Sequence, residues 1–180
     1  AVYRYEGTIA QLLGDGVLAF FGAPITHEDD PIRAVHAALD MQEGREEYRR
    51  ELEGYVEGFQ MRVGVHSGTV VVGAMGDDLH MEYLALGDAV NLAARLQSEA
   101  KPGKVLLSEN TARLVKGVFD LESLGEIRVK GKAEPVSVYQ VTGAKAVPES
   151  RRGLEGLRSP LIGRDRELAR LQAALGSLSE

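Results

Sequence analysis

Runs of alternating or clustered apolar residues predict β-strands along most of the chain. The predicted strands are residues 8–13, 17–21, 59–66, 69–72, 82–86, 105–108, 119–129 and 136–141. The tripeptide 14–16 (Gly-Asp-Gly) separates the first two strands, and Asp-Gly is a strong signal for a tight hairpin turn. The dipeptide 67–68 (Ser-Gly) predicts a second hairpin, between the third and fourth strands, and Gly125 predicts a turn within the seventh.

Helical spacing of apolar residues, bounded by capping residues, predicts helices between these strands. The predicted helices are residues 1–6, 31–52, 89–99, 109–116 and 164–178. Asp30, Asp88 and Ser108 stand where N-terminal caps belong. Gly7 stands where the first helix would end. Strands and helices in this order predict an α+β fold, in the form of an α/β sandwich.

One polar stripe runs along the predicted helix 89–99 and its cap. It consists of Asp88, Asn91, Arg95 and Glu99, at spacings of three, four and four residues. Residues at these spacings share one face of a helix. The stripe has two interpretations. The amide of Asn91 and the guanidinium of Arg95 could bind an anion whose charge grows during a reaction. Alternatively, the stripe has no function and simply faces water.

Composition narrows the class of protein. The 180 residues carry a net charge of −6 and no cysteine. A negative chain without a basic stripe is not expected to bind nucleic acid, and the lack of cysteine excludes a disulfide frame or a thiolate metal site. No apolar run reaches the roughly 18 residues that a membrane helix needs. We therefore expect a cytoplasmic protein with no membrane partner.

Several other residues allow both a structural and a chemical interpretation. Asp15 is either a turn residue or a carboxylate held for a hard cation such as Mg²⁺. Arg62 is either a surface residue or an anion ligand. Lys130 lies beside a glycine between two strands, where it either is solvated or reaches an anion. His66 is interpreted as a structural hairpin residue.

Several motifs together resemble the catalytic domain of class III adenylyl and guanylyl cyclases. The motifs are residues 13–19 (LGDGVLA), 27–31 (HEDDP), 61–68 (MRVGVHSG), 86–96 (LGDAVNLAARL) and 129–132 (VKGK). They occur in the family's order and with similar spacings. The resemblance covers residues 1–142 and implies a ferredoxin-like βαββαβ sheet with helices on one face. It also implies a head-to-tail homodimer whose active sites lie at the subunit interface.

The resemblance implies a role for each matching residue. Asn91 is similar to the asparagine that orients the ribose, and Arg95 to the arginine that stabilises the pentavalent transition state. Arg62 and Lys130 match phosphate-binding residues, and Asp15 matches the second of two metal-binding aspartates. In the family, two Mg²⁺ or Mn²⁺ ions bridge the phosphates and the attacking 3′-hydroxyl.

The chain departs from the family pattern at three places. The first strand of the family, with its other metal aspartate, has no counterpart, so one of the two expected metal ligands is absent from this chain. Gln11 and Leu84 stand at the purine-selecting positions. Leucine forms no hydrogen bond with a base, and glutamine can donate or accept, so these two residues leave the choice between ATP and GTP undecided. ATP is favoured only because most bacterial relatives with this arrangement are called adenylyl cyclases.

The third departure is at the C-terminal end. Residues 143–159 are rich in Gly, Pro, Ser, Glu and Arg and predict a linker. Residues 160–171 (PLIGRDRELARL) resemble the entry segment of a signal-transducing P-loop ATPase module, although the phosphate loop itself is not present in this chain. The resemblance implies that 160–180 begin an ATPase module covalently linked to the cyclase domain.

The sequence thus predicts a nucleotidyl cyclase of intracellular signalling, which converts ATP or GTP to a 3′,5′-cyclic nucleotide and pyrophosphate. The alternative is a cyclase-like domain without catalysis that serves as a dimerising or nucleotide-sensing module. Gln11 and Leu84 favour the alternative, whereas Asp15, Asn91, Arg95 and Lys130 favour the enzyme. A diguanylate cyclase is disfavoured because the Gly-Gly-Asp/Glu-Glu-Phe signature is missing.

Overall fold

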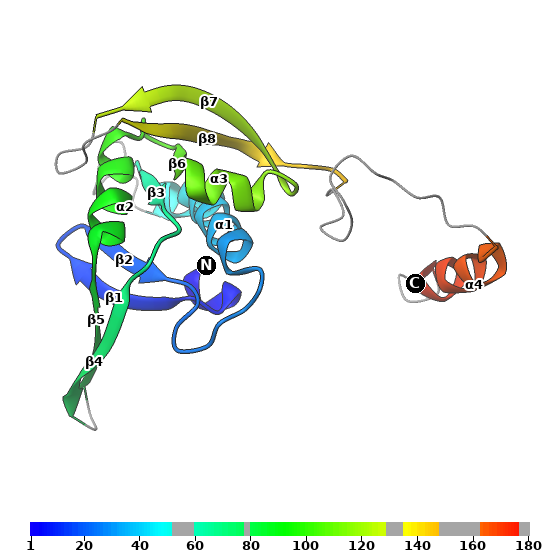
Figure 1. Cartoon of the computed structure of the whole chain (residues 1–180), viewed down its shortest axis with the longest axis horizontal. Helices are drawn as coiled ribbons and strands as arrows, with labels where there is room; N and C mark the ends of the chain where they lie inside the picture. Colours follow the sequence, from blue (N-terminus) through cyan, green and yellow to red (C-terminus); the bar gives the residue numbers. More distant parts are fainter. Residues whose placement is uncertain (52–59, 78–79, 129–134, 148–162, 177–180) are drawn as a thin grey trace. The chain divides into compact units, whose positions relative to one another are not determined.

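Four strands form the central sheet, in the order β3-β6-β8-β7 (Figure 1). In this computed structural model of the protein the strands are β3 (Val63–Val65), β6 (Val105–Ser108), β7 (Phe119–Ile127) and β8 (Val136–Ala144). β3 runs parallel to β6, and the other two pairs are antiparallel. The mixed sheet and its helices confirm the predicted α+β class.

The structure describes residues 1–51, 60–77, 80–128, 135–147 and 163–176. The chain divides into two compact units, Ala1–Glu149 and Ser150–Glu180. Lys130, most of the linker predicted over 143–159, and both ends of the segment 160–180 lie outside the described residues. The side chains of residues 74–77 and 80–86 in the β4–β5 hairpin are also not described.

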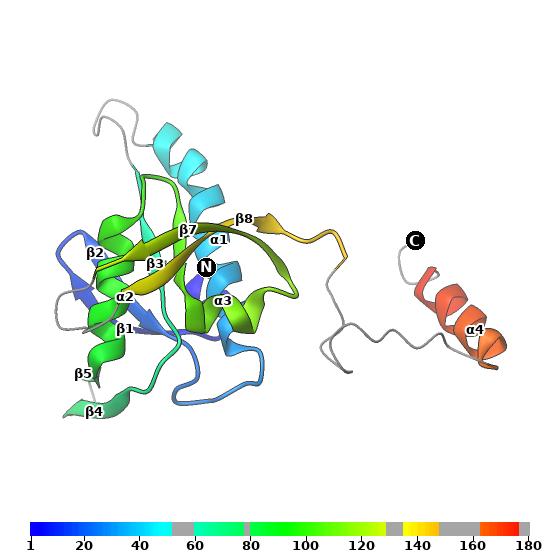
Figure 2. The same ribbon diagram turned by 45° about the horizontal axis from the view of Figure 1, so that its top comes forward.

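Helices cover both faces of the four-stranded sheet. They are α1 (Asp30–Glu51), α2 (Asp88–Glu99) and α3 (Glu109–Val115). In β6, Val105 and Leu107 pack with residues of α1 and α3, whereas Leu106 packs with residues of α2. Successive side chains of a strand point to opposite faces. The resemblance implied helices on one face of the sheet only, and this expectation is wrong. Figure 2 shows the same elements from a second direction.

Two hairpins lie beside this sheet. The first joins β1 (Thr8–Leu13) to β2 (Gly16–Phe20), and its register from Thr8↔Phe20 to Leu13↔Gly16 confirms the predicted turn. The second joins β4 (Val71–Asp77) to β5 (His80–Leu86). β1 lies against β5 (Figure 1).

Two predicted features of the strands are wrong. The segment 59–66 does not form a hairpin with 69–72, because β3 pairs with β6 and β4 pairs with β5. The reason is burial: Val63 and Val65 face one apolar cluster while Gly64 faces α2, so β3 is covered on both faces. Gly125 does not end a strand either, since β7 continues through an irregularity in its register there.

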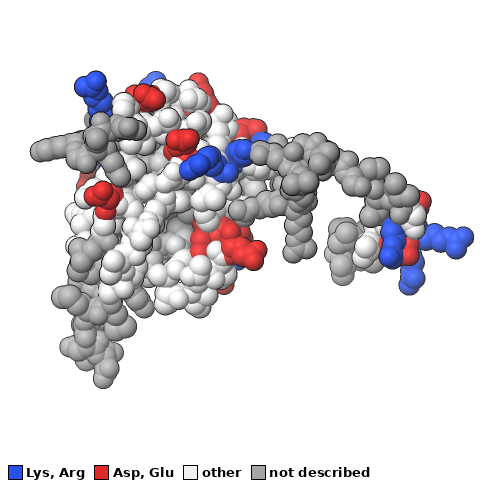
Figure 3. Space-filling model, viewed as in Figure 1, with Lys and Arg blue, Asp and Glu red and all other residues white. Residues whose placement is uncertain are grey.

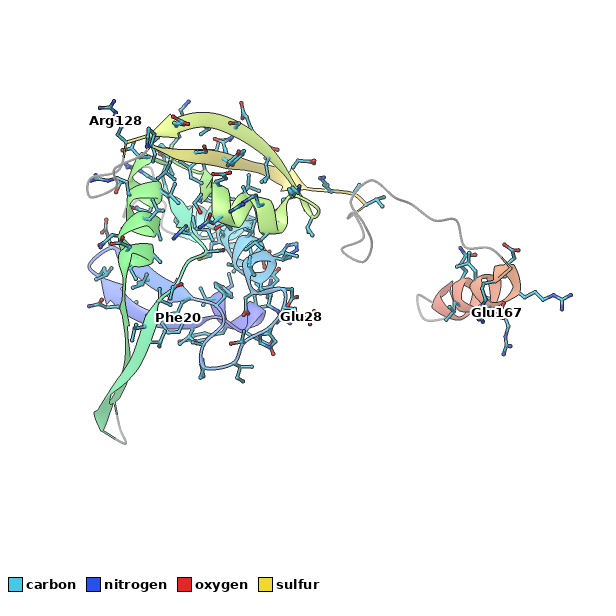
Figure 4. All side chains as sticks on the ribbon, in the orientation of Figure 1. Phe20, Glu28, Arg128 and Glu167 are labelled. Atoms are coloured by element: carbon cyan, nitrogen blue, oxygen red, sulfur yellow. The ribbon has the colours of Figure 1, made fainter. Side chains whose placement is uncertain are left out.

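The N-terminal segment packs on α1. It is a 3-10 turn, η1 (Val2–Tyr5), rather than the end of an α-helix. The left-handed residue that closes it is Glu6, not the predicted Gly7. Ion pairs then join this segment to α1, since Arg4 Nη1 lies 2.8 Å from Asp40 Oδ2 and Glu6 contacts Arg33. Figure 3 shows acidic side chains gathered where Glu28 is labelled in Figure 4, at the loop before α1.

The second unit contains α4 (Asp165–Gly176), which confirms a helix within the predicted range 164–178. An ion pair of 3.6 Å joins Arg164 to Glu167 in its first turn. Among the helices of the described residues, none has the length and apolar character required to cross a membrane.

Candidate active site

α2 carries the polar stripe and turns it away from the protein core. Leu92 and Leu96 are buried against the sheet, and Ala89 is buried as well. Asn91 is exposed and Arg95 is half-buried. The burial of the apolar face on the sheet confirms the predicted helix and leaves the stripe at the surface. The cap differs by one residue, because the helix begins at Asp88 and Gly87 is its N-cap.

Two glycines set the position of α2. A Cβ atom at Gly64 would overlap main-chain atoms of Ala93 and Gln97, so the helix lies directly on β3. Gly87 joins β5 to α2 with φ 150° and ψ 164°, a conformation that is open essentially to glycine alone. Sequence analysis assigned no role to Gly64. A glycine inside a strand is a known signal of close backbone approach, and it would have pointed to this contact.

The β1–β2 hairpin presents two more of the predicted residues. Asp15 is exposed and forms the two-residue turn together with Gly14. Gln11 is exposed on β1 and lies opposite Leu18 of β2. A carboxylate at the end of a short hairpin is accessible to a cation from solvent.

The remaining predicted residues lie on other elements. Leu84 is in β5, opposite Gly73, and thus on the strand that lies beside Gln11's strand. Arg62 is exposed and directly precedes β3. Arg128 at the end of β7 (Figure 4) is the last described residue before Lys130, whose own position is not described.

One copy of the chain does not assemble these residues into a bonded site. Among the residues that the structure describes, no side-chain hydrogen bond or ion pair joins any two of Gln11, Asp15, Arg62, Asn91 and Arg95. The described residues also contain no group of three or more acidic or histidine side chains fit to hold a metal ion. Asp15 alone therefore does not make a site for two metal ions, which need several oxygen ligands.

The chain belongs to a family of cyclases. The sequence model "Adenylate and Guanylate cyclase catalytic domain" matches residues 5–143, which is most of the chain. This match confirms the resemblance that the five motifs carried.

The chain is similar both to proteins named adenylate cyclases and to proteins named guanylate cyclases. It is 34% identical over 146 residues to Adenylate cyclase 1 of Rhizobium meliloti (strain 1021), covering 79% of this chain and 22% of that protein. The solved adenylyl cyclase CyaB from P. aeruginosa is 36% identical with a TM-score of 0.72, covering 85% of this chain and 77% of that one.

A guanylate cyclase is similar as well. The guanylate cyclase domain of RhGC from Catenaria anguillulae, solved in complex with GTP, is 32% identical with a TM-score of 0.67. The match covers 80% of this chain and 76% of that one. The chain spans about a fifth of the length of the curated adenylate cyclase named above.

Proposed function

We propose that this chain carries a nucleotidyl cyclase domain that converts ATP or GTP to a 3′,5′-cyclic nucleotide and pyrophosphate in intracellular signalling. The observation that supports it most is the arrangement of α2. Its apolar face is buried on the sheet, and its outer face presents Asn91 and Arg95 within a chain of the cyclase family. A rigid helix is the kind of support that positions reacting groups accurately.

The reaction requires the ribose 3′-hydroxyl to attack the α-phosphorus while pyrophosphate leaves. Negative charge then spreads over the phosphoryl oxygens, and a guanidinium can donate two parallel hydrogen bonds to them. We assign this role to Arg95. Asn91 lies one helical turn before it and is assigned to the ribose, whose ring oxygen and hydroxyls match an amide that both accepts and donates.

The other predicted residues are assigned to binding. Arg62 and Lys130 are proposed to hold phosphate oxygens, and Gln11 and Leu84 to face the purine. A glutamine amide can serve either adenine or guanine, since it both donates and accepts hydrogen bonds. The choice between ATP and GTP therefore stays open in the proposal.

Asp15 is the candidate ligand of a Mg²⁺ or Mn²⁺ ion. The described residues of one copy do not complete a two-ion site, so further ligands would have to come from elsewhere. We further propose that the site forms between two copies of the chain. Within the described part of one copy, no hydrogen bond or ion pair joins the hairpin residue Asp15 to the helix residues Asn91 and Arg95.

The proposal is tested by an assay of cyclic nucleotide formation with Mn²⁺, in which the full-length protein receives ATP and GTP separately. We expect product from at least one nucleotide. Arg95→Ala is expected to lower kcat by about a hundredfold or more, as for the loss of one charge-stabilising donor. Asn91→Ala is expected to lower kcat as well.

Arg113→Ala is the matched control for this assay. Arg113 is exposed near the end of α3, and within the described part of the chain its guanidinium pairs only with a neighbouring side chain, Asn110, at 3.1 Å. Its loss should leave kcat unchanged. Absence of product from both nucleotides, with the protein folded, would contradict the proposed reaction.

A second candidate function follows from Gln11 and Leu84. These residues depart from the purine-selecting pattern, which favours a cyclase-like module that binds a nucleotide or another copy without turnover. Binding of ATP or GTP without any cyclic product would establish this candidate in place of the first.

We also propose that the domain, residues 1–142, is cytoplasmic and is followed by a linker (143–159) and the start of an ATPase module (160–180). The first two residues of this predicted linker, 143 and 144, complete β8 and so belong to the sheet. Support comes from the separate second unit and from α4, whose amphipathic sequence suits the first helix of a further domain. A full-length protein that hydrolyses ATP at a second site would test this assignment.

A further inference from the structure

A chain of hydrogen bonds joins the ends of β3 and β6 to α3. Its members, here called the His66 network, are His66, Ser67, Ser108 and Thr111. His66 Nδ1 lies 2.7 Å from Ser108 Oγ, and Ser108 Oγ lies 3.3 Å from Thr111 Oγ1. Thr111 Oγ1 lies 3.1 Å from Ser67 Oγ, so the chain returns to the segment that carries His66.

The network has a rigid base. Ser108 is 2% exposed and Thr111 is completely buried. Ser108 is the N-cap of α3, because its hydroxyl oxygen accepts a hydrogen bond from the Thr111 N–H. The parallel register Val65↔Leu107 of β3 and β6 brings position 66 beside position 108. A buried hydroxyl that loses its hydrogen-bond partner lowers the stability of the folded state. The buried Ser108 and Thr111 therefore hold the imidazole ring in one orientation.

The other side of His66 faces α2. A Cβ atom at Gly68 would lie 2.7 Å from His66 Nε2 and 3.1 Å from the Cβ of Ala89. A Cβ atom at Gly87 would lie 3.2 Å from the carbonyl oxygen of Thr69. The segment after β3 therefore packs tightly between the imidazole and the first turn of α2.

We infer that His66 is a positioning residue for the candidate active site. Its hydrogen bond to the buried Ser108 holds the imidazole in place, and the imidazole in turn fixes the position of the segment 67–69. This segment packs on the first turn of α2 and sets the position of that turn. Asn91 follows two residues after Ala89, and Arg95 lies one turn further along the same helix. This inference rests on the proposed function, and it adds a residue that does not itself touch the nucleotide.

A small movement of α2 is sufficient to matter. Catalytic groups displaced by about 1 Å can lose on the order of a hundredfold in rate. A loss of positioning lowers kcat more than it changes KM, because the groups concerned act mainly in the transition state.

The test compares His66→Leu, which removes the hydrogen bond to Ser108, with His66→Asn, which keeps a polar atom near the place of Nδ1. Ser108→Ala removes the other partner and serves if His66→Leu fails to fold. Val115→Ala is the matched control: it creates a cavity in the buried cluster between α3 and α1, and Val115 is neither a member of the network nor part of the cluster that contains α2. The readouts are kcat, KM and the amide hydrogen exchange of peptides from α2.

We expect His66→Leu to lower kcat by about tenfold or more with KM within about threefold of wild type, and His66→Asn to recover most of kcat. Exchange in α2 should be faster in His66→Leu and unchanged in Val115→Ala. A wild-type kcat or unchanged exchange in α2 of His66→Leu would overturn the inference. If the wild-type protein makes no cyclic nucleotide, the proposed function fails, and the exchange data alone then decide whether His66 positions α2.

Discussion

Gly64 determines how closely α2 approaches β3. Its neighbours across the contact are main-chain atoms of α2, which cannot rotate aside as a side chain would. The alternate residues Val63 and Val65 pack into the opposite face. A single hydrogen atom at position 64 therefore allows the helix that carries Asn91 and Arg95 to lie on the sheet itself.

We predict that Gly64→Ala destabilises the protein by about 1–3 kcal/mol, as an added methyl group does in a packed core. It should also lower kcat, because α2 must shift to admit the methyl group. Urea unfolding and the cyclase assay measure the two effects. Gly73→Ala is the control, since a Cβ atom at Gly73 on β4 would meet no heavy atom of the described residues within 4 Å, its two chain neighbours aside. Equal stability of the two variants would show that the contact with α2 is not tight.

The beginning of α1 is held by a group of ion pairs. Arg33 Nε donates to Asp29 Oδ1 over 2.8 Å, and Arg33 also contacts Glu6 from the N-terminal turn. The hydrogen bond from Arg33 is the main reason why the pKa of Asp29 lies below its ordinary value of 3.8. Burial opposes this shift, and the positive charge of Arg33 adds to it.

This shift predicts a pH dependence of stability. Because the pKa of Asp29 is lower in the folded state, its contribution is complete above the unfolded pKa and is lost as the pH falls through the folded pKa. Asp29→Asn should thus lower the free energy of unfolding at pH 7 by at most about 1 kcal/mol, the range of solvent-exposed pairs. The difference from wild type should shrink below about pH 4.

Thermal unfolding between pH 7 and pH 3 measures this difference. Asp120→Asn is the control, because Asp120 is exposed on β7 and its side chain has no hydrogen bond or ion pair within the described part of the chain. A constant difference between Asp29→Asn and wild type across this range would contradict the role assigned to the Arg33 hydrogen bond.

At the scale of the whole molecule, we propose that the site forms between two copies of the chain. A symmetric dimer then contains two equal sites, each with the hairpin of one copy and α2 of the other. Mixing Asp15→Ala with Arg95→Ala protein should restore activity, since each mixed dimer has one intact site. With random pairing we expect about a quarter of the wild-type rate.

The matched control is a mixture of Asn91→Ala and Arg95→Ala protein. Both residues lie on α2 of the same copy, so every site in this mixture carries one defect and no activity should return. Absence of recovery in the first mixture would place Asp15 and Arg95 in the same copy's site and contradict the shared site.

The sequence by itself determined the local features of this protein. The turn at Gly14 and Asp15, the cap at Ser108 and the outward stripe on α2 follow from residues within one or two turns of each other. Family motifs added the cyclase identity. These signals suffice because hairpin turns, caps and helix faces depend on neighbouring residues.

Only the tertiary structure decided the partners of these elements. The pairing of β3 with β6, the helices on both sheet faces, and the contacts of Gly64 and His66 join residues that are far apart in sequence. The segment 59–66 has an alternation that fits a hairpin equally well. The parallel pairing of β3 with β6 is selected because it buries both faces of β3. This burial depends on which apolar surfaces meet when the whole chain folds.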